Sequence, residues 1–135
     1  MADYTLLNLK SDVEDSGERF GYAPHMEARF ARKPLNLEQS GISYFKLAPR
    51  YRVPFGHLHS EQEEVYVVLS GSARVKLDDE ILELNPMDAV RIPTSVKRGL
   101  EAGSEGAEVL AFGAPDTDNK DIEMDQEFWP AGGSS

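Results

Sequence analysis

Apolar and polar residues alternate over short stretches between residues 25 and 113, which is the period-2 pattern of half-buried β-strands. Met26, Ala28 and Phe30, for example, alternate with polar neighbours. Glycine and proline punctuate the stretches, and short strands about 8–12 residues apart are typical of an antiparallel sandwich or barrel. The pattern predicts strands at 25–30, 42–48, 64–69, 73–77, 80–84, 89–92, 96–100 and 108–112, with helical turns allowed only at 12–18, 35–39 and 119–127.

This pattern predicts an all-β protein with one domain. The length of 135 residues suits a single domain. We expect a barrel core over residues 25–113, an N-terminal strand extension and a short acidic C-terminal tail over residues 114–135. No apolar run approaches the roughly 20 residues of a membrane span, and no secretory signal pattern opens the chain. Cysteine is absent, which favours an intracellular, cytoplasmic protein.

The formal net charge of -10 is unevenly distributed. The stretch 29–98 is near neutral, whereas acidic residues dominate 99–135. A net acidic chain disfavours nucleic acid as a partner. We expect residues 116–127 to be a solvated surface segment. The apolar pair Phe128 and Trp129 then anchors the tail on the barrel or on a partner subunit.

The densest candidate chemistry lies between residues 54 and 64. His57 and His59 are two residues apart, so on a strand both imidazoles point to the same face. Glu64 follows after a short gap and can return to meet them. Two histidines and a carboxylate form the facial triad that binds iron, and manganese, nickel or zinc tolerate it. The alternative is a hydrogen-bonded cluster near a barrel mouth. The remaining histidine, His25, is expected to be exposed.

Aromatic residues are assigned to the core rather than to cofactor stacking, because they dominate apolar burial in small sandwiches. Tyr66 and Val68 share the face of Glu64 on a regular strand and should line the same cavity. The aromatic residues assigned to the core are Tyr44, Phe45, Phe55, Tyr66 and Phe112.

The stretch from His57 to Gly71 resembles the first motif of the cupin superfamily, G-x5-H-x-H-x3–4-E-x6-G. His57, His59, Glu64 and Gly71 match it without a gap, whereas Tyr51 occupies the leading glycine position. The resemblance covers roughly residues 40–113 and implies a small jelly-roll barrel. It also implies a homodimer built by exchanging N-terminal strands, for which residues 4–9 are the candidate.

The second cupin motif, G-x5-P-x-G-x2-H-x3-N, is degenerate. Pro93 fits it, but Arg98 stands where the family has its last metal-binding histidine. A guanidinium stays protonated and offers no lone pair, so Arg98 cannot ligate a metal. The other departures are Met87, Ser95 and Ala102.

Three alternatives follow for Arg98. It points inward and pairs with Glu64, leaving a metal-free polar pocket. Otherwise it clamps an anionic substrate beside a surviving three-ligand metal site. In the third alternative the register slips by one residue and Arg98 lies outside the barrel.

The leading functional hypothesis is a small-molecule-binding cupin that takes a small organic anion, with Arg98, Tyr66, His57 and His59 as ligand-binding residues. The alternative is a metal-dependent enzyme of the dioxygenase or isomerase type, with His57, His59 and Glu64 as metal ligands. The cofactor is then iron, manganese, nickel or zinc, and otherwise none. A third hypothesis is a non-catalytic interaction protein that docks a partner through its acidic tail and Trp129. No catalytic residue is assigned.

Overall fold

The structure, a computed structural model, describes residues 2–54, 56–59, 62–114 and 122–129 of the chain, and only the backbone of residues 58, 59 and 122. The described residues form eight strands and no helix, which confirms the all-β prediction. The strands are β1 (Met26–Phe30), β2 (Gly41–Leu47), β3 (Gly56–His59), β4 (Glu64–Leu77), β5 (Glu80–Leu84), β6 (Ala89–Ile92), β7 (Arg98–Gly113) and β8 (Ile122–Asp125).

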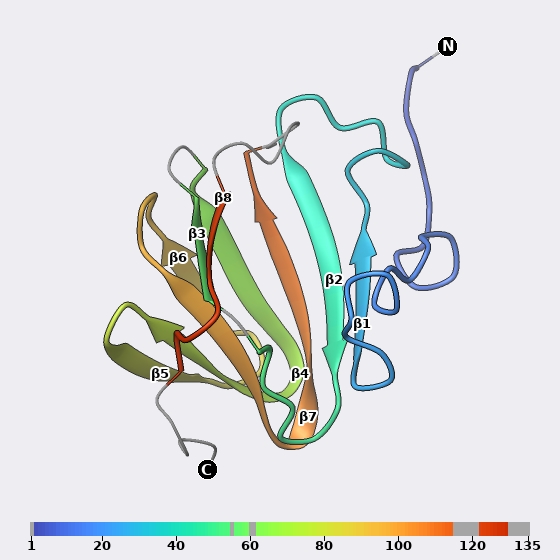
Figure 1. Cartoon of the computed structure of the whole chain (residues 1–135). Helices are drawn as coiled ribbons and strands as arrows, with labels where there is room; N and C mark the ends of the chain where they lie inside the picture. The colour runs from blue at the N-terminus through green and yellow to red at the C-terminus, as the bar shows by residue number, and fades with distance from the viewer. Residues whose placement is uncertain (1, 55, 60–61, 115–121, 130–135) are drawn as a thin grey trace.

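The strands form one curled antiparallel sheet, because β4 and β7 are long enough to bend from one half to the other (Figure 1). In the first half the order is β1-β2-β7-β4-β6, and this half uses the start of β4 and the end of β7. In the second half the order is β5-β4-β7-β3-β8, with the end of β4 and the start of β7. The two halves face each other as a jelly roll.

Glycines allow these bends. The β4–β7 register shifts between residues 68 and 70 and again between 71 and 73. Gly71 and Gly106 both have positive φ there, and a Cβ at Gly106 would stand 2.7 Å from the carbonyl oxygen of Leu47. Glycine tolerates positive φ and close backbone approach without a steric penalty. The strand pairs predicted at 64–69 with 73–77, and at 96–100 with 108–112, are therefore each one bent strand.

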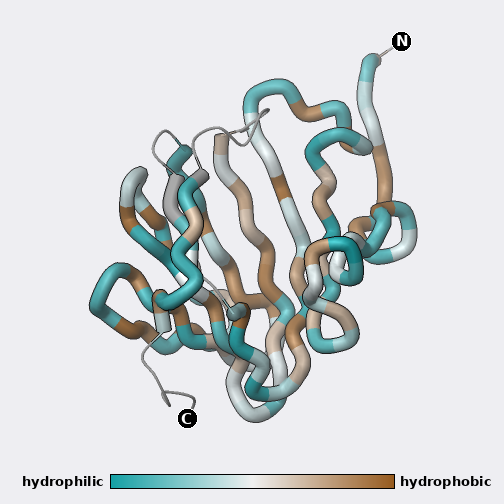
Figure 2. The backbone as a smooth tube through the Cα atoms, viewed as in Figure 1, coloured by the Kyte–Doolittle hydropathy of each residue, from teal (hydrophilic) through white to brown (hydrophobic). Residues whose placement is uncertain are grey.

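The core lies between the two halves of the sheet. Hydrophobic positions run along the central strands, whereas the connecting segments are largely hydrophilic (Figure 2). The buried apolar side chains that pack together are Met26, Leu47, Val53, Tyr66, Val68, Ala73, Val75, Leu84, Ile92, Leu100, Ala102, Ala107, Val109 and Ala111.

The aromatic predictions hold only in part. Tyr66 is buried in the core and Phe45 packs against it. Tyr44 is also buried, but at the outer face, where the Nζ atom of Lys10 lies 5.3 Å from its ring centroid. Phe112 is 40% exposed, whereas the preceding Ala111 is buried. Adjacent residues of a strand face opposite sides, so Phe112 points outward from β7. Phe55 lies outside the described residues.

The segments in which helical turns were allowed contain no helix in the described part of the chain. Residues 12–18 and 35–39 form turns and bends. Residues 122–125 form β8 instead of a helical turn, because their backbone pairs with β3. Glu123 and Met124 are nevertheless exposed. The prediction of a solvated segment is thus right for these two side chains, and the expectation of helix is wrong.

The N-terminal segment runs along the outside of the sheet. Tyr4 and Leu6 are largely exposed, and residues 4–9 belong to none of the strands described in this chain. Strand exchange with a second copy stays a prediction. No described helix is long and apolar enough to cross a membrane.

Candidate functional site

A buried ion pair joins the two halves of the sheet. Arg98 opens β7 in the second half, and Glu64 opens β4 in the first half. The Arg98 Nη1 atom donates to Glu64 Oε1 at 2.9 Å. The Arg98 side chain is 0% exposed and that of Glu64 is 15% exposed. Arg98 therefore points inward and pairs with Glu64, as the first alternative expects, and the alternative that places it outside the barrel is wrong.

The other guanidinium nitrogens of Arg98 donate hydrogen bonds to the turn before β7. Nη2 donates to the carbonyl oxygens of Val96 at 2.9 Å and Pro93 at 3.3 Å, and Nε donates to Val96 at 3.3 Å. A guanidinium has five N–H donors. Because most of them act within the chain and a carboxylate balances the charge, Arg98 is not an open anion clamp.

His57 lies directly across from Arg98 in the β3–β7 register, on the same face. Its Nε2 atom is 4.0 Å from Glu64 Oε1, and its side chain is 22% exposed. That distance is too long for a hydrogen bond but suits an ion pair when the imidazole is protonated. The predicted meeting of His57 and Glu64 is thus present. The side chain of His59 lies outside the described residues.

Tyr66 completes the cluster from β4, two residues after Glu64. Its phenol is buried close to the Glu64 carboxylate. Burial raises the pKa of Tyr66 well above its usual range, and the negative charge of Glu64 adds to this rise. Val68 is fully buried on the same face. Both predicted neighbours of Glu64 therefore face the interior.

Two further tyrosines lie near this cluster, and the sequence pattern did not predict them. Burial raises the pKa of Tyr22 to about 12, with a smaller contribution from Tyr51. Tyr51 also stacks on His25, with ring centroids 5.4 Å apart. His25 is exposed, as predicted. Because Tyr22 precedes the first strand, no alternation of apolar and polar residues could have placed it.

The cluster has the groups needed for proton transfer. Arg98 donates to Glu64, which keeps that carboxylate in place beside His57. A carboxylate next to an imidazole stabilises the imidazolium that forms when the histidine accepts a proton. His57 supplies the imidazole of this cluster, and histidine is the side chain most often used as a general acid or base.

The described side chains do not fit a divalent metal. Among them, no three His, Asp or Glu groups come close enough to hold one. Glu64 already accepts from Arg98, and the buried guanidinium repels a second cation.

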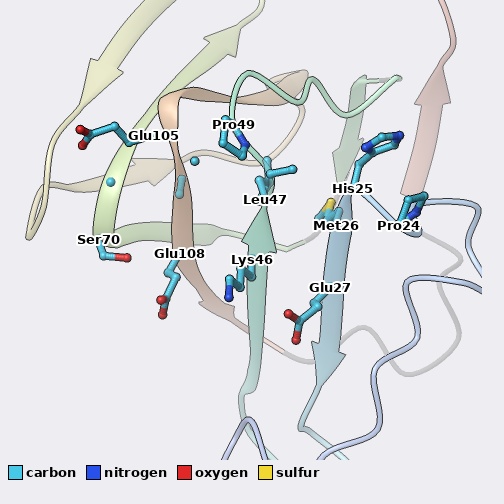
Figure 3. A pocket seen from close by; sticks show the side chains of 14 residues that line it. Pro24, His25, Met26, Glu27, Lys46, Leu47, Pro49, Ser70, Glu105 and Glu108 are labelled. Atoms are coloured by element: carbon cyan, nitrogen blue, oxygen red, sulfur yellow. The ribbon is translucent and has the colours of Figure 1, made fainter.

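A cavity lies elsewhere in the described structure. It has a volume of about 250 Å³ and lies at the end of β1 and β2 against the bends of β4 and β7 (Figure 3). Glu27, Lys46 and Glu108 are among its lining residues. None of the residues around Glu64 lines it, so we place the candidate site at the buried polar cluster and not in this cavity.

Comparisons with known proteins agree with the fold. A cupin protein from Bacteroides fragilis has a TM-score of 0.69 at 25% identity, over 87% of this chain and 89% of that chain. The polyketide cyclase RemF from Streptomyces resistomycificus has a TM-score of 0.72 at 21% identity, over 96% and 88%. The structure of PAC13 from Streptomyces with uridine has a TM-score of 0.66 at 12% identity, over 92% and 90%.

No curated protein matches the chain. The family model described as the cupin domain matches residues 43–113, which include His57, Glu64 and Arg98. The match spans more than half of the chain, and the bent jelly roll agrees with it. The protein therefore belongs to the cupin family.

Proposed function

We propose that this cupin binds a small organic molecule in the barrel interior, next to His57, Glu64, Tyr66 and Arg98. The observation that carries the proposal is the buried Arg98–Glu64 pair, whose carboxylate lies 4.0 Å from His57 Nε2. Polar groups that converge inside an otherwise apolar barrel are typical of a ligand site.

The ligand class follows from the charges of the cluster. A preference for an anion depended on an accessible guanidinium, but Arg98 is fully buried and paired with Glu64. The Arg98–Glu64 pair has no net charge. We therefore infer that the ligand is an uncharged polar molecule, which His57 recognises by hydrogen bonding. Where the bound molecule reacts, His57 moves the proton and Glu64 orients the imidazole.

A matched pair of ring compounds tests this proposal. Uracil is neutral at pH 7, whereas orotate is the same ring with a carboxylate, and uridine is bound in the related PAC13 structure. We expect uracil or uridine to shift the imidazole NMR signals of His57 with a Kd at least tenfold below that of orotate. His57→Gln should abolish this binding. Tighter orotate binding that is lost in Arg98→Met would overturn the proposal in favour of an anion.

The second candidate function is a metal-dependent enzyme that uses His57, His59 and Glu64. The approach of His57 to Glu64 favours it. Metal analysis of the purified protein separates the two candidates. Near-stoichiometric iron, manganese, nickel or zinc that is lost in His57→Ala would establish the metal site, whereas the same trace content in both proteins supports the first proposal.

A further inference from the structure

Strand β3, which carries His57, is joined to the described sheet mainly through β8. Its register with β7 consists of the single pair His57 and Arg98. Its register with β8 covers all four residues of the strand, from Gly56 opposite Asp125 to His59 opposite Ile122. The C-terminal strand therefore provides most of the described backbone pairing that holds β3.

Phe128 packs where β3 meets β7. Its side chain is 8% exposed. A Cβ at Gly56 would stand 2.3 Å from the Cδ2 atom of Phe128, and a Cβ at Gly99 would stand 3.0 Å from the same atom. A Cβ at Gly56 would therefore collide with the ring, and a Cβ at Gly99 would make a tight contact with it. These glycines are the immediate neighbours of His57 and Arg98, so the ring contacts the backbone that carries both site residues.

Two cations lie over the aromatic rings of this segment. The Nζ atom of Lys76 is 3.7 Å from the centroid of the Phe128 ring. The guanidinium carbon of Arg52 is 4.1 Å from the centroid of the Trp129 ring. Contacts of this kind are attractive when the cation is within about 6 Å of the ring. The Trp129 ring therefore contacts Arg52 of its own chain, which favours anchoring on the barrel over docking to a partner.

An ion pair reinforces the attachment on β8 itself. Lys97 Nζ lies 3.0 Å from Asp125 Oδ2. The hydrogen bond from Lys97 lowers the pKa of Asp125 and raises that of Lys97. Lys97 directly precedes Arg98, so this pair also ties the end of the chain to the start of β7.

We propose that residues 122–129, which we call the C-terminal clasp, position His57 against Glu64. The clasp pairs with the edge of β3 and inserts the Phe128 ring between the backbones at Gly56 and Gly99. Phe128 is a positioning residue, because it acts through the strand and contacts neither His57 nor Glu64 as a reacting group. This proposal rests on the proposed function, in which His57 is the residue that binds the ligand.

The test measures the clasp and the site separately. Trp129 is the one tryptophan of the chain, so its fluorescence reports release of the clasp. Diethyl pyrocarbonate reacts with accessible imidazoles, and peptide mapping gives the rates of His57 and the exposed His25 in one sample. We expect Phe128→Ala to shift the Trp129 emission to longer wavelength and to speed His57 modification at least fivefold, with the His25 rate unchanged.

Gly99→Ala provides a second route to the same result, because the added methyl group would stand 3.0 Å from Phe128 Cδ2 and from Trp129 Nε1 and would push both rings outward. Gly41→Ala is the matched control, since nothing lies within 4 Å of a Cβ at that position. The conservative variant Phe128→Tyr should keep the parent rate at His57. A general loss of folding would raise the His25 rate and lower the melting temperature without rescue by tyrosine.

Two results would overturn the proposal. One is a shift of Trp129 emission while the His57 rate stays at the parent value in both variants. The other is unchanged Trp129 emission in both variants, because then the Phe128 contact does not hold the clasp. The assay needs no ligand, so a failure of uracil to bind would contradict the proposed function and leave this result intact.

Discussion

Replacing Arg98 with histidine tests the chemistry of the site most directly. The substitution removes the guanidinium that occupies Glu64 and adds an imidazole at the position where the cupin motif has a metal-binding histidine. His57 lies directly across the strand pair from this position, and its Nε2 atom is 4.0 Å from Glu64 Oε1. We expect Arg98→His to bind nickel or zinc at least tenfold more tightly than the parent.

The magnitude follows from the charge that is removed. A dication about 5 Å from a guanidinium is repelled by about 7 kcal/mol at an effective dielectric constant near 20. Solvent reaches the site, because the side chains of His57 and Glu64 are 22% and 15% exposed, and it screens much of this energy. A residual gain of only about 1.4 kcal/mol already corresponds to a tenfold change in Kd.

The substitution also has a structural cost. Removal of one partner from a buried ion pair destabilises a protein by about 3–5 kcal/mol. The metal-free variant should therefore melt below the parent and recover when nickel or zinc is added. Calorimetric titration gives the affinities, and thermal unfolding with and without metal checks that the protein is folded during the titration.

Arg91→His is the matched control, because Arg91 is an exposed arginine paired with Glu63 at the surface. It adds a histidine to the same protein away from the site. Equal metal affinity in the parent and in Arg98→His, or an equal gain in Arg91→His, would refute the reasoning that the guanidinium blocks the site. The gain should also disappear when His57→Ala is combined with Arg98→His.

Three further predictions follow from other parts of the molecule. Glu101 is buried between Arg52 at 2.7 Å and Arg74 at 3.2 Å, so Glu101→Gln should lower the free energy of unfolding in urea by about 2–4 kcal/mol; a loss below 0.5 kcal/mol, on the order of a surface substitution, would contradict this. Because the folded pKa of Tyr66 is raised, it stays protonated while the unfolded chain ionises, so stability should fall as the pH rises above about 10. Tyr66→Phe should flatten that fall, and an identical pH profile would count against burial of the phenol. Light scattering should give a mass near twice the 15.0 kDa of the chain, and a clean monomer at micromolar concentration would exclude the predicted homodimer.

The strands were predictable where their pattern is local. The bounds predicted for β5 and β6 agree with the structure, because alternating burial is encoded within each strand. The bends in β4 and β7 were not predictable, because each was expected to be a break between two strands. Gly71 and Gly106 adopt positive φ inside long strands, and a turn between two strands would need glycine in the same way. Local sequence therefore cannot distinguish one bent strand from two strands joined by a turn.

The residues of the candidate site were predictable from the sequence, but the contact between Arg98 and Glu64 was only one of three alternatives. The spacing of His57 and Glu64 on strands was enough to expect that they meet. The direction of Arg98 was open, because a slip of one residue turns a side chain to the other face. The C-terminal clasp was predictable only in part. Phe128 and Trp129 were expected to anchor the tail, and Phe128 is buried. Strand β8 was not expected, because its acidic composition is typical of solvated surface and it forms only by pairing with the edge of β3.

Arg98 places a fixed positive charge in the site, whereas in a metal-binding cupin the positive charge comes from a bound ion. Arg98 joins the two halves of the sheet through Glu64, so it ties together elements that are far apart along the sequence. A bound metal can exchange a ligand for substrate, but a guanidinium has no lone pair to accept and no open position to offer. Under the proposed function, this leaves hydrogen bonding and proton transfer to His57.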